Sequence, residues 1–159
     1  KAQVDENTWG RNDYKLSAVL RVPTRSREYN MTVASNLYAK PVYRDTIIQQ
    51  IANSKLRANK KYVYSCLNFI LVGNAVENID GMDENTFLQK NFFEKLGTTT
   101  TTYNPLTKFE KERIAPTEKD GFLRKQLLQD YVPDEGAAFM GGVSGHAGFF
   151  SNANAWAKL

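Results

Sequence analysis

The residue types with the clearest chemical potential stand together in Tyr64-Ser65-Cys66, directly before a long apolar segment. A phenol has a pKa of about 10, so Tyr64 could act as a base at neutral pH only where a nearby cation favours its phenolate. From the residues alone, a tyrosine here is more typical of packing. Ser65 is more typical of a helix N-cap than of a catalytic hydroxyl, and no histidine lies nearby in sequence to activate the Cys66 thiol.

A second group is found near the end of the chain, in the glycine-rich run 141–148. Ser144 and His146 could form a nucleophile and its base, but a nucleophile elbow needs glycine where His146 stands. A small hydrolase built on this pair would also need a third, orienting residue, which the sequence does not identify. We therefore expect His146 to be a turn residue whose ring bonds to loop backbone. Asp134 and Glu135 could pair as acid and base, but solvation or capping of the following turn is more typical of them.

The bulk composition excludes several classes of protein. The chain has 159 residues, of which 42% are hydrophobic and 24% charged, as in one ordinary globular domain. Its net charge is +4, but the basic residues are spread out and the densest cluster, 57–61, is more typical of a solvated loop than of a nucleic-acid site. One cysteine and one histidine predict neither an internal disulfide nor a structural metal site.

The apolar periodicity predicts three helices that would position these side chains. The first covers about 42–53, the second begins after Ser65 and ends at Gly81, and the third runs from near Asp83 to Gly97. The second helix carries two apolar stripes, so we expect it to be buried on both faces. These stripes are Phe69, Val72, Val76 and Ile79 on one side, and Leu67, Ile70, Leu71 and Ala75 on the other.

The fold class that follows is mainly α, with long loops and at most short strands. Met31 and Val33 alternate with polar neighbours before Pro41, which indicates a short strand or an extended arm, and 122–132 is ambiguous between helix and extended chain. We see no strands able to form a sheet of their own. The expected organisation is an irregular, extended arm over 1–41 and a helical subdomain over 42–159. Both ends look truncated, since the chain opens on Lys1 and closes two turns into a helix.

Several longer motifs resemble the serine β-lactamase-like family, which includes class C β-lactamases, penicillin-binding proteins and related esterases. In that family a Tyr-x-Asn box opens a buried helix, as Tyr64-Ser65-Cys66 does here. The resemblance runs from about Tyr43 to Leu159, and the glycine-rich motif is similar to the branch found in Bacteroidetes. The other matching stretches are Leu67 to Gly73, Gly81-Met82, Phe93 to Gly97, Thr99 to Thr102, Ile114 to Glu118 and Gly141 to Ser151.

The resemblance implies an acyl-transfer enzyme of the bacterial envelope, periplasmic or secreted, that uses no cofactor or metal. In the family, a serine of a Ser-x-x-Lys box attacks a β-lactam, peptidoglycan-peptide or ester carbonyl, and the tyrosine of the Tyr-x-Asn box shuttles the proton. On this basis Tyr64 is the proton shuttle. Cys66 stands at the substrate-binding position where the family usually has Asn or Asp, so an amide expected to contact substrate is missing.

Two of the family's boxes are absent from the chain. No serine is followed by lysine three residues later, and Lys-Thr-Gly does not occur, while His146-Ala147-Gly148 lacks the hydroxyl of a His-Thr-Gly box. We therefore expect the chain to be an internal fragment of a larger serine hydrolase and to be inactive alone. It could self-associate through the helix face left uncovered by a missing sheet. The alternative is a non-catalytic binding or scaffold module that kept the fold and lost the chemistry.

Overall fold

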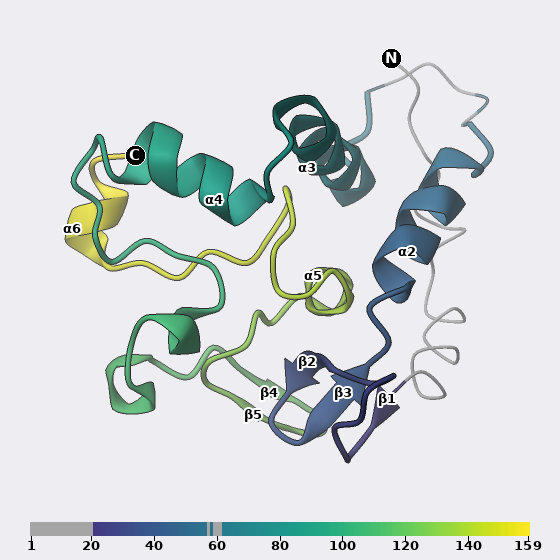
Figure 1. The fold of residues 1–159 in the computed structure, drawn as a ribbon, viewed down its shortest axis with the longest axis horizontal. Coiled ribbons are helices and arrows are strands. Elements are labelled where there is room, and N and C mark those ends of the chain that lie inside the picture. Colours follow the sequence, from purple (N-terminus) through teal and green to yellow (C-terminus); the bar gives the residue numbers. More distant parts are fainter. Residues whose placement is uncertain (1–20, 57, 59–61) are drawn as a thin grey trace.

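The computed structural model describes residues 21–56, 58 and 62–159. The basic cluster 57–61, apart from Ala58, and the first half of the expected arm lie outside the described residues. Figure 1 shows helix α5 (Glu135–Phe139) at the centre, with α3 (Cys66–Asp80) on one side and short strands on the other. Within the described part, no helix is both long and apolar enough to span a membrane.

Two small antiparallel sheets are present. Strand β3 (Leu37–Ala39) lies between β1 (Arg21–Val22) and β2 (Met31–Ala34), and β4 (Glu118–Asp120) pairs with β5 (Gln126–Leu128). The expectation that the chain has no sheet of its own was therefore wrong. Strands of two to four residues are too short to show a periodic pattern, so the apolar periodicity does not reveal them.

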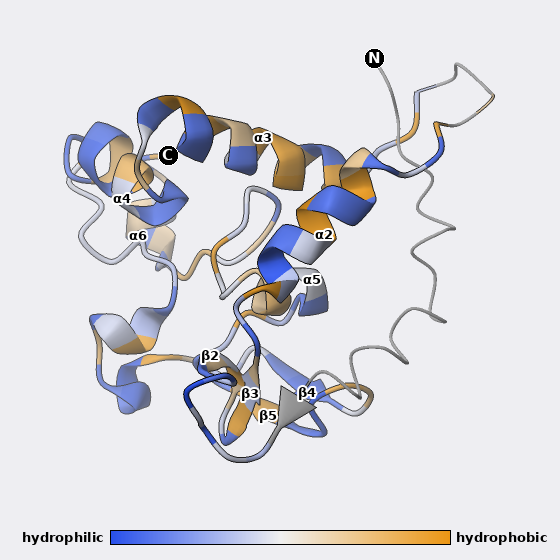
Figure 2. Cartoon of the chain, turned by 45° about the vertical axis from the view of Figure 1, so that its right-hand side comes forward, coloured by the Kyte–Doolittle hydropathy of each residue, from blue (hydrophilic) through white to orange (hydrophobic). Residues whose placement is uncertain are grey.

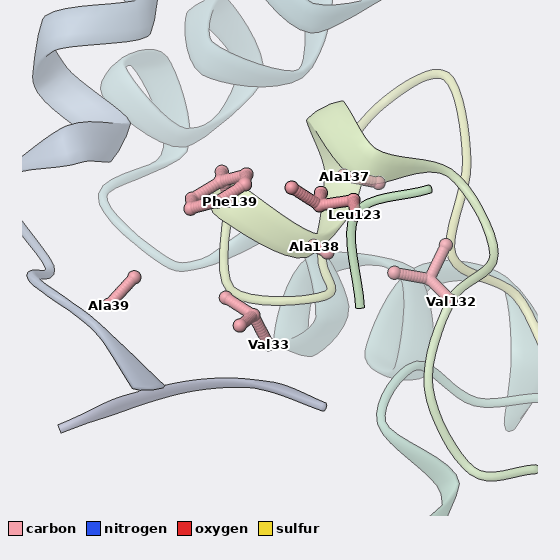
Figure 3. Packing of buried hydrophobic residues seen from close by; sticks show 7 residues of the cluster. All are labelled: Val33, Ala39, Leu123, Val132, Ala137, Ala138 and Phe139. Atoms are coloured by element: carbon pink, nitrogen blue, oxygen red, sulfur yellow. The ribbon is translucent and has the colours of Figure 1, made fainter. Parts of the chain in front are cut away.

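The central core joins the first sheet to α5. Its buried residues are Val33, Ala39, Leu123, Val132, Ala137, Ala138 and Phe139, which Figure 3 shows converging from separate parts of the chain. The described part of the expected arm, 21–41, thus contributes two core residues. A second cluster packs α2 (Tyr43–Ala52) against α3 through Ile51, Leu67, Ile70 and Met140.

The helix boundaries follow local hydrogen bonds. The Ser65 hydroxyl accepts from the Leu67 N–H at 3.3 Å, and Gly81 ends α3 in the left-handed conformation with φ of 73°. Asp83 caps α4 (Glu84–Leu88) by accepting from the Thr86 N–H. The cap at Ser65, the end at Gly81 and the start of a helix near Asp83 were predicted from sequence. Beyond α4 the chain continues as a π-helical turn, Gln89–Phe93.

The remaining elements are short. Single 3₁₀ turns cover Pro105–Thr107 and Lys111–Arg113, and α6 (Ala153–Trp156) lies beside α4 in Figure 1. The ambiguous segment 122–132 is extended where it forms β5. Long connections thus link the elements between α4 and α5, as the sequence indicated.

Helix α3 is buried on one face only, so the expectation of burial on both was wrong. Leu67, Ile70 and Gly73 are buried, whereas Phe69, Val72 and Ile79 are exposed. The buried stripe belongs to the second core cluster, whereas Phe69, Val72 and Ile79 belong to neither of the two buried clusters. Figure 2 shows the apolar residues along this helix.

This asymmetry predicts unequal effects of two truncations on stability. Ile70 is 4% exposed and Val72 is 59% exposed. We expect Ile70→Ala to lower the free energy of unfolding by about 2–4 kcal/mol, because it leaves a cavity in the core. Val72→Ala should change it by less than about 0.5 kcal/mol. Urea unfolding followed by circular dichroism measures both, and equal losses would contradict the assigned orientation of α3.

Candidate functional site

The start of α3 brings the two predicted site residues together. Ser65 is extended, with φ of −149° and ψ of 128°, and its cap bond fixes the first turn below Tyr64. The Tyr64 side chain lies at the surface, 57% exposed, with its ring centroid 5.8 Å from that of Phe69. Cys66 is half-buried, and its Sγ donates a long hydrogen bond of 3.9 Å to the Tyr64 hydroxyl. The phenol is thus accessible, and the position that carries the unusual cysteine adjoins it.

A glycine-rich loop, residues 141–148, packs directly against α3. Figure 1 shows the loop rising from the end of α5 towards α3. A Cβ added to Gly145 would lie 2.2 Å from the Phe69 carbonyl oxygen, and one added to Gly73 would lie 3.1 Å from the Gly145 nitrogen. Only glycine permits so close a contact between two backbones. The loop therefore touches the turn whose Phe69 ring packs on Tyr64.

Three hydrogen-bonded polar side chains hold the loop in place; those of Ser144 and His146 are buried, and that of Asp134 is 38% exposed. The Ser144 Oγ lies 2.9 Å from His146 Nδ1, and His146 Nε2 lies 2.8 Å from Asp134 Oδ1. The third residue that sequence reasoning could not identify is therefore Asp134. Its candidacy as a helix cap was correct as well, since the same Oδ1 accepts from the Ala137 N–H at 2.7 Å. The expectation that the His146 ring bonds to loop backbone was wrong, because both nitrogens contact side chains.

The charge state of these three side chains depends on Asp134. Burial alone would raise the pKa of Asp134, but the hydrogen bonds from His146 and from the Ala137 N–H outweigh it and hold that pKa below its usual range. An ionised Asp134 accepts from the His146 Nε2–H, which leaves Nδ1 of a neutral imidazole to accept from the Ser144 hydroxyl. The order carboxylate, imidazole, hydroxyl is that of a serine hydrolase triad, but the ring nitrogens are exchanged, because here the hydroxyl contacts Nδ1 and the carboxylate contacts Nε2.

The burial of Ser144 argues against a nucleophile at this place. The residue is 3% exposed, and its carbonyl oxygen accepts from the Ala147 N–H at 3.1 Å and from the Tyr103 hydroxyl at 3.4 Å. A nucleophile must come within about 3 Å of a substrate carbonyl, which the surrounding backbone prevents here. The three side chains therefore serve to fix the loop. Glu135 takes no part in these contacts.

A second pair of side chains, which is buried and which sequence reasoning missed, packs against the opposite side of the loop. Glu84 Oε1 accepts from the Tyr103 hydroxyl at 2.9 Å, and Glu84 Oε2 fills the space beside Gly73. Burial raises the pKa of Glu84, although the hydrogen bond from Tyr103 lowers it in part. Burial and the adjacent Glu84 charge also raise the pKa of Tyr103. No sequence signal marked this pair, because 19 residues separate its members.

The described residues contain no group of three or more His, Cys, Asp or Glu side chains arranged to hold a metal ion. The arrangement can hold a phenol at a fixed, accessible position, and it can hold a loop rigidly beneath that phenol.

The lowered pKa of Asp134 predicts a stability that depends on pH. A carboxyl whose pKa is lower when folded adds stability above its unfolded pKa, about 3.9, and loses that contribution as the pH falls through the folded value. Asp134→Asn keeps an oxygen for both donors but not the charge. We expect its loss of unfolding free energy relative to wild type to be present at pH 7 and to shrink towards pH 3.

Asp134→Ala should also lose the cap of α5, which is worth about 0.5–2 kcal/mol at both pH values. Urea titrations at pH 7 and pH 3 measure these differences, and Asp80→Asn, at the exposed end of α3, is the matched control. A deficit in Asp134→Asn that grows as the pH falls would contradict the assigned hydrogen bonds.

A family model and several relatives match most of this chain in sequence. The β-lactamase family model matches residues 16–159, so the likeness begins within the expected arm rather than at residue 43. A protein of Escherichia coli K12 described as "Putative D-alanyl-D-alanine carboxypeptidase" is 33% identical over 161 residues, which cover 90% of this chain and 37% of the relative. A Salmonella typhimurium protein with the same description is 30% identical over 168 residues, covering 94% and 38%.

The chain thus spans well under half the length of these relatives, and no solved structure matches it. The Bacteroidetes branch stays a prediction. A family match over residues 16–159 and relatives at or above 30% identity across nine-tenths of the chain establish its kinship. The chain belongs to the serine β-lactamase-like family.

Proposed function

We propose that this chain is the helical part of a serine hydrolase that forms an acyl-enzyme, with Tyr64 as its proton shuttle. The observation that carries the proposal is the position of Tyr64. Its phenol is exposed directly before the capped first turn of α3, and a close-packed loop holds that turn from below. A proton shuttle needs this combination of access and rigidity.

The proposed reaction divides the catalytic groups between this chain and the rest of the whole protein. Tyr64 would take the proton of an attacking serine hydroxyl as the serine oxygen bonds to the substrate carbonyl carbon. It would then give the proton to the leaving nitrogen or oxygen as the scissile bond breaks, and water would later release the acyl group. Nucleophile and oxyanion donors would come from outside the chain, in keeping with the absence of both family boxes.

The substrate class is β-lactam, peptidoglycan-peptide or ester. The description of the Escherichia and Salmonella relatives favours a peptide that ends in D-alanyl-D-alanine, and with it a site in the cell envelope or outside the cell. At position 66 the family's amide is replaced by a thiol, a weaker hydrogen-bond partner for a substrate amide. We therefore propose weaker substrate binding than an asparagine would give.

The exposed stripe of α3 supports the same division. Phe69, Val72 and Ile79 form an apolar face beside Tyr64, and a face of this kind on a soluble domain marks an interaction surface. We propose that the remainder of the whole protein covers it. Self-association of the isolated chain through this face stays a prediction.

The alternative, a non-catalytic module, is favoured by Cys66 and by the two absent boxes. It differs from the enzyme in one testable way, because a module without chemistry does not need the Tyr64 hydroxyl. The replacement of that single oxygen therefore distinguishes the two proposals.

We expect Tyr64→Phe to lower the acylation rate of the whole protein by about 10²-fold or more, the usual contribution of a general base. The fold should persist, because only an exposed hydroxyl is removed. Single-turnover acylation by a penicillin-type substrate gives the rate. Tyr62→Phe, also an exposed tyrosine two residues away, is the matched control and should leave the rate unchanged. Equal rates for Tyr64→Phe and wild type would reduce Tyr64 to a packing role.

The chain by itself should not react with acylating probes. Acylation needs a nucleophile, a base and an oxyanion hole within a few ångströms of one carbonyl, and this chain supplies only the base. The test is incubation with a penicillin-type or fluorophosphonate probe, followed by intact-mass measurement. We expect no adduct. A stoichiometric adduct that disappears in Ser144→Ala would instead establish Ser144, His146 and Asp134 as a second reactive site.

A further inference from the structure

Glu84 and Tyr103 place three oxygen atoms in a row between α4 and the loop 141–148. Glu84 Oε1 lies 2.9 Å from the Tyr103 hydroxyl, and the same hydroxyl lies 3.4 Å from the Ser144 carbonyl oxygen. A phenol carries one hydrogen, so it donates well to only one of these two acceptors. The distances indicate that Glu84 receives it here, because 3.4 Å is longer than an ordinary O–H···O bond.

The surroundings of Glu84 make its charge sensitive to pH. The residue is 8% exposed, and burial raises the pKa of its carboxyl, with the nearby Glu77 carboxylate acting in the same direction. The hydrogen bond from Tyr103 opposes this rise, as do Arg44 on α2 and His146 in the loop, but the net shift is upward. Tyr103 keeps its own proton, because burial and the Glu84 charge raise its pKa. Glu84 is therefore the member of the row that gains a proton as the pH falls below neutrality.

A proton on Glu84 reverses the direction of the first hydrogen bond. The protonated carboxyl donates to the phenol oxygen of Tyr103, and the phenol then has its own hydrogen free for the Ser144 carbonyl. One proton taken up from water thus turns the Tyr103 hydroxyl from α4 towards the loop. The Ser144 carbonyl also accepts from the Ala147 N–H at 3.1 Å, so it is paired in both arrangements.

The loop is packed closely enough on both sides to follow this change. A Cβ added to Gly148 would lie 2.7 Å from Cδ1 of the Tyr103 ring. On the other side of the loop, a Cβ added to Gly145 would lie 2.2 Å from the Phe69 carbonyl oxygen of α3. Few flexible side chains lie between these backbones, so a displacement at Ser144 is passed on rather than absorbed.

We propose that Glu84 and Tyr103 form a proton-controlled switch that sets how tightly the loop 141–148 is held. When Glu84 is protonated, Tyr103 donates to the Ser144 carbonyl and draws the loop towards its own ring. When Glu84 is ionised, Tyr103 donates to the carboxylate and that bond to the loop is released. The switch is a property of this chain and is independent of the acyl transfer proposed for Tyr64.

The test is a pH titration of this chain from about pH 8 to about pH 4, a range that lies above the titration of Asp134. It follows the NMR signals of the Glu84 carboxyl carbon, the Ser144 carbonyl carbon and the Gly145 amide. We expect all three to share one midpoint, which lies above the ordinary glutamate value of about 4.3. Loop signals without a component at the Glu84 midpoint overturn the proposal.

The linkage of this proton to stability gives a second measurement. A carboxyl whose pKa is raised on folding adds stability below its unfolded pKa and loses that contribution as the pH rises through the folded value. The unfolding free energy of the wild type relative to Glu84→Gln should therefore fall as the pH rises through the Glu84 midpoint. A difference that grows over the same range contradicts the proposed protonation.

Two variants separate the switch from a through-space effect of the Glu84 charge. Tyr103→Phe keeps the charge and removes the hydroxyl, so Glu84 should titrate at a higher pH while the Ser144 carbonyl loses most of its response. Glu84→Gln is uncharged at every pH and its amide can donate to the phenol oxygen, so the loop signals should stay at their low-pH positions. Glu94→Gln, at an exposed glutamate, is the matched control and should behave as wild type.

A Ser144 response in Tyr103→Phe as large as that of the wild type overturns the proposal, and so do loop signals of Glu84→Gln that match the high-pH form. If either variant does not fold, as shown by circular dichroism, the double variant Glu84→Leu/Tyr103→Phe decides the matter. It replaces both polar partners by apolar side chains, a change that a buried pair often tolerates. The loop should then show no component at the wild-type Glu84 midpoint. A component that persists assigns the response to another group, such as His146, and overturns the proposal.

Discussion

The contact between the backbones of Gly145 and α3 is the constraint on which the rest of this structure depends. A carbonyl oxygen of the helix occupies the space that a side chain at 145 would need, and Gly73 has no side chain on the facing surface. The loop and the helix therefore meet without intervening side chains, as rigid bodies rather than through adaptable packing. The position of the helix start, with Tyr64 and Cys66, follows from this contact.

Buried polar groups keep that contact in register. Asp134, His146 and Ser144 tie the loop to α5, and Glu84 and Tyr103 close it from the side of α4. Each of these side chains has a hydrogen-bond partner, so burial costs little and orientation is specific. Asp130 is different, since one of its oxygens is buried without a donor in the described part of the chain.

The one-sided burial of α3 connects the structure to the proposed function. Its inner stripe belongs to the core of this chain, and its outer stripe is apolar, exposed and adjacent to Tyr64. A reaction centre that is divided between this segment and the rest of a larger hydrolase accounts for both observations. In the proposed reaction the phenol would come from this chain, and the nucleophile would come from the part that covers the outer stripe.

The sequence by itself determined the features that depend on neighbours within a few residues. Ser65, Gly81, Asp83 and Asp134 act as helix ends, as predicted, because each cap is a hydrogen bond or a backbone conformation formed within about three residues. The motifs around Tyr64 and in the loop 141–148 also determined the family. These signals are local, so the order of residues contains them completely.

Only the tertiary structure decided which stripe of α3 is buried, that short strands pair into sheets, and that Asp134 reaches His146. Two equally apolar stripes cannot be ranked from periodicity, because the choice depends on which partners, here Ile51 and Met140, the fold brings near. The pairing of Tyr103 with Glu84 is likewise set by packing. Each of these features joins residues that are distant in sequence. The free energy that selects such contacts comes from burial shared by the whole domain.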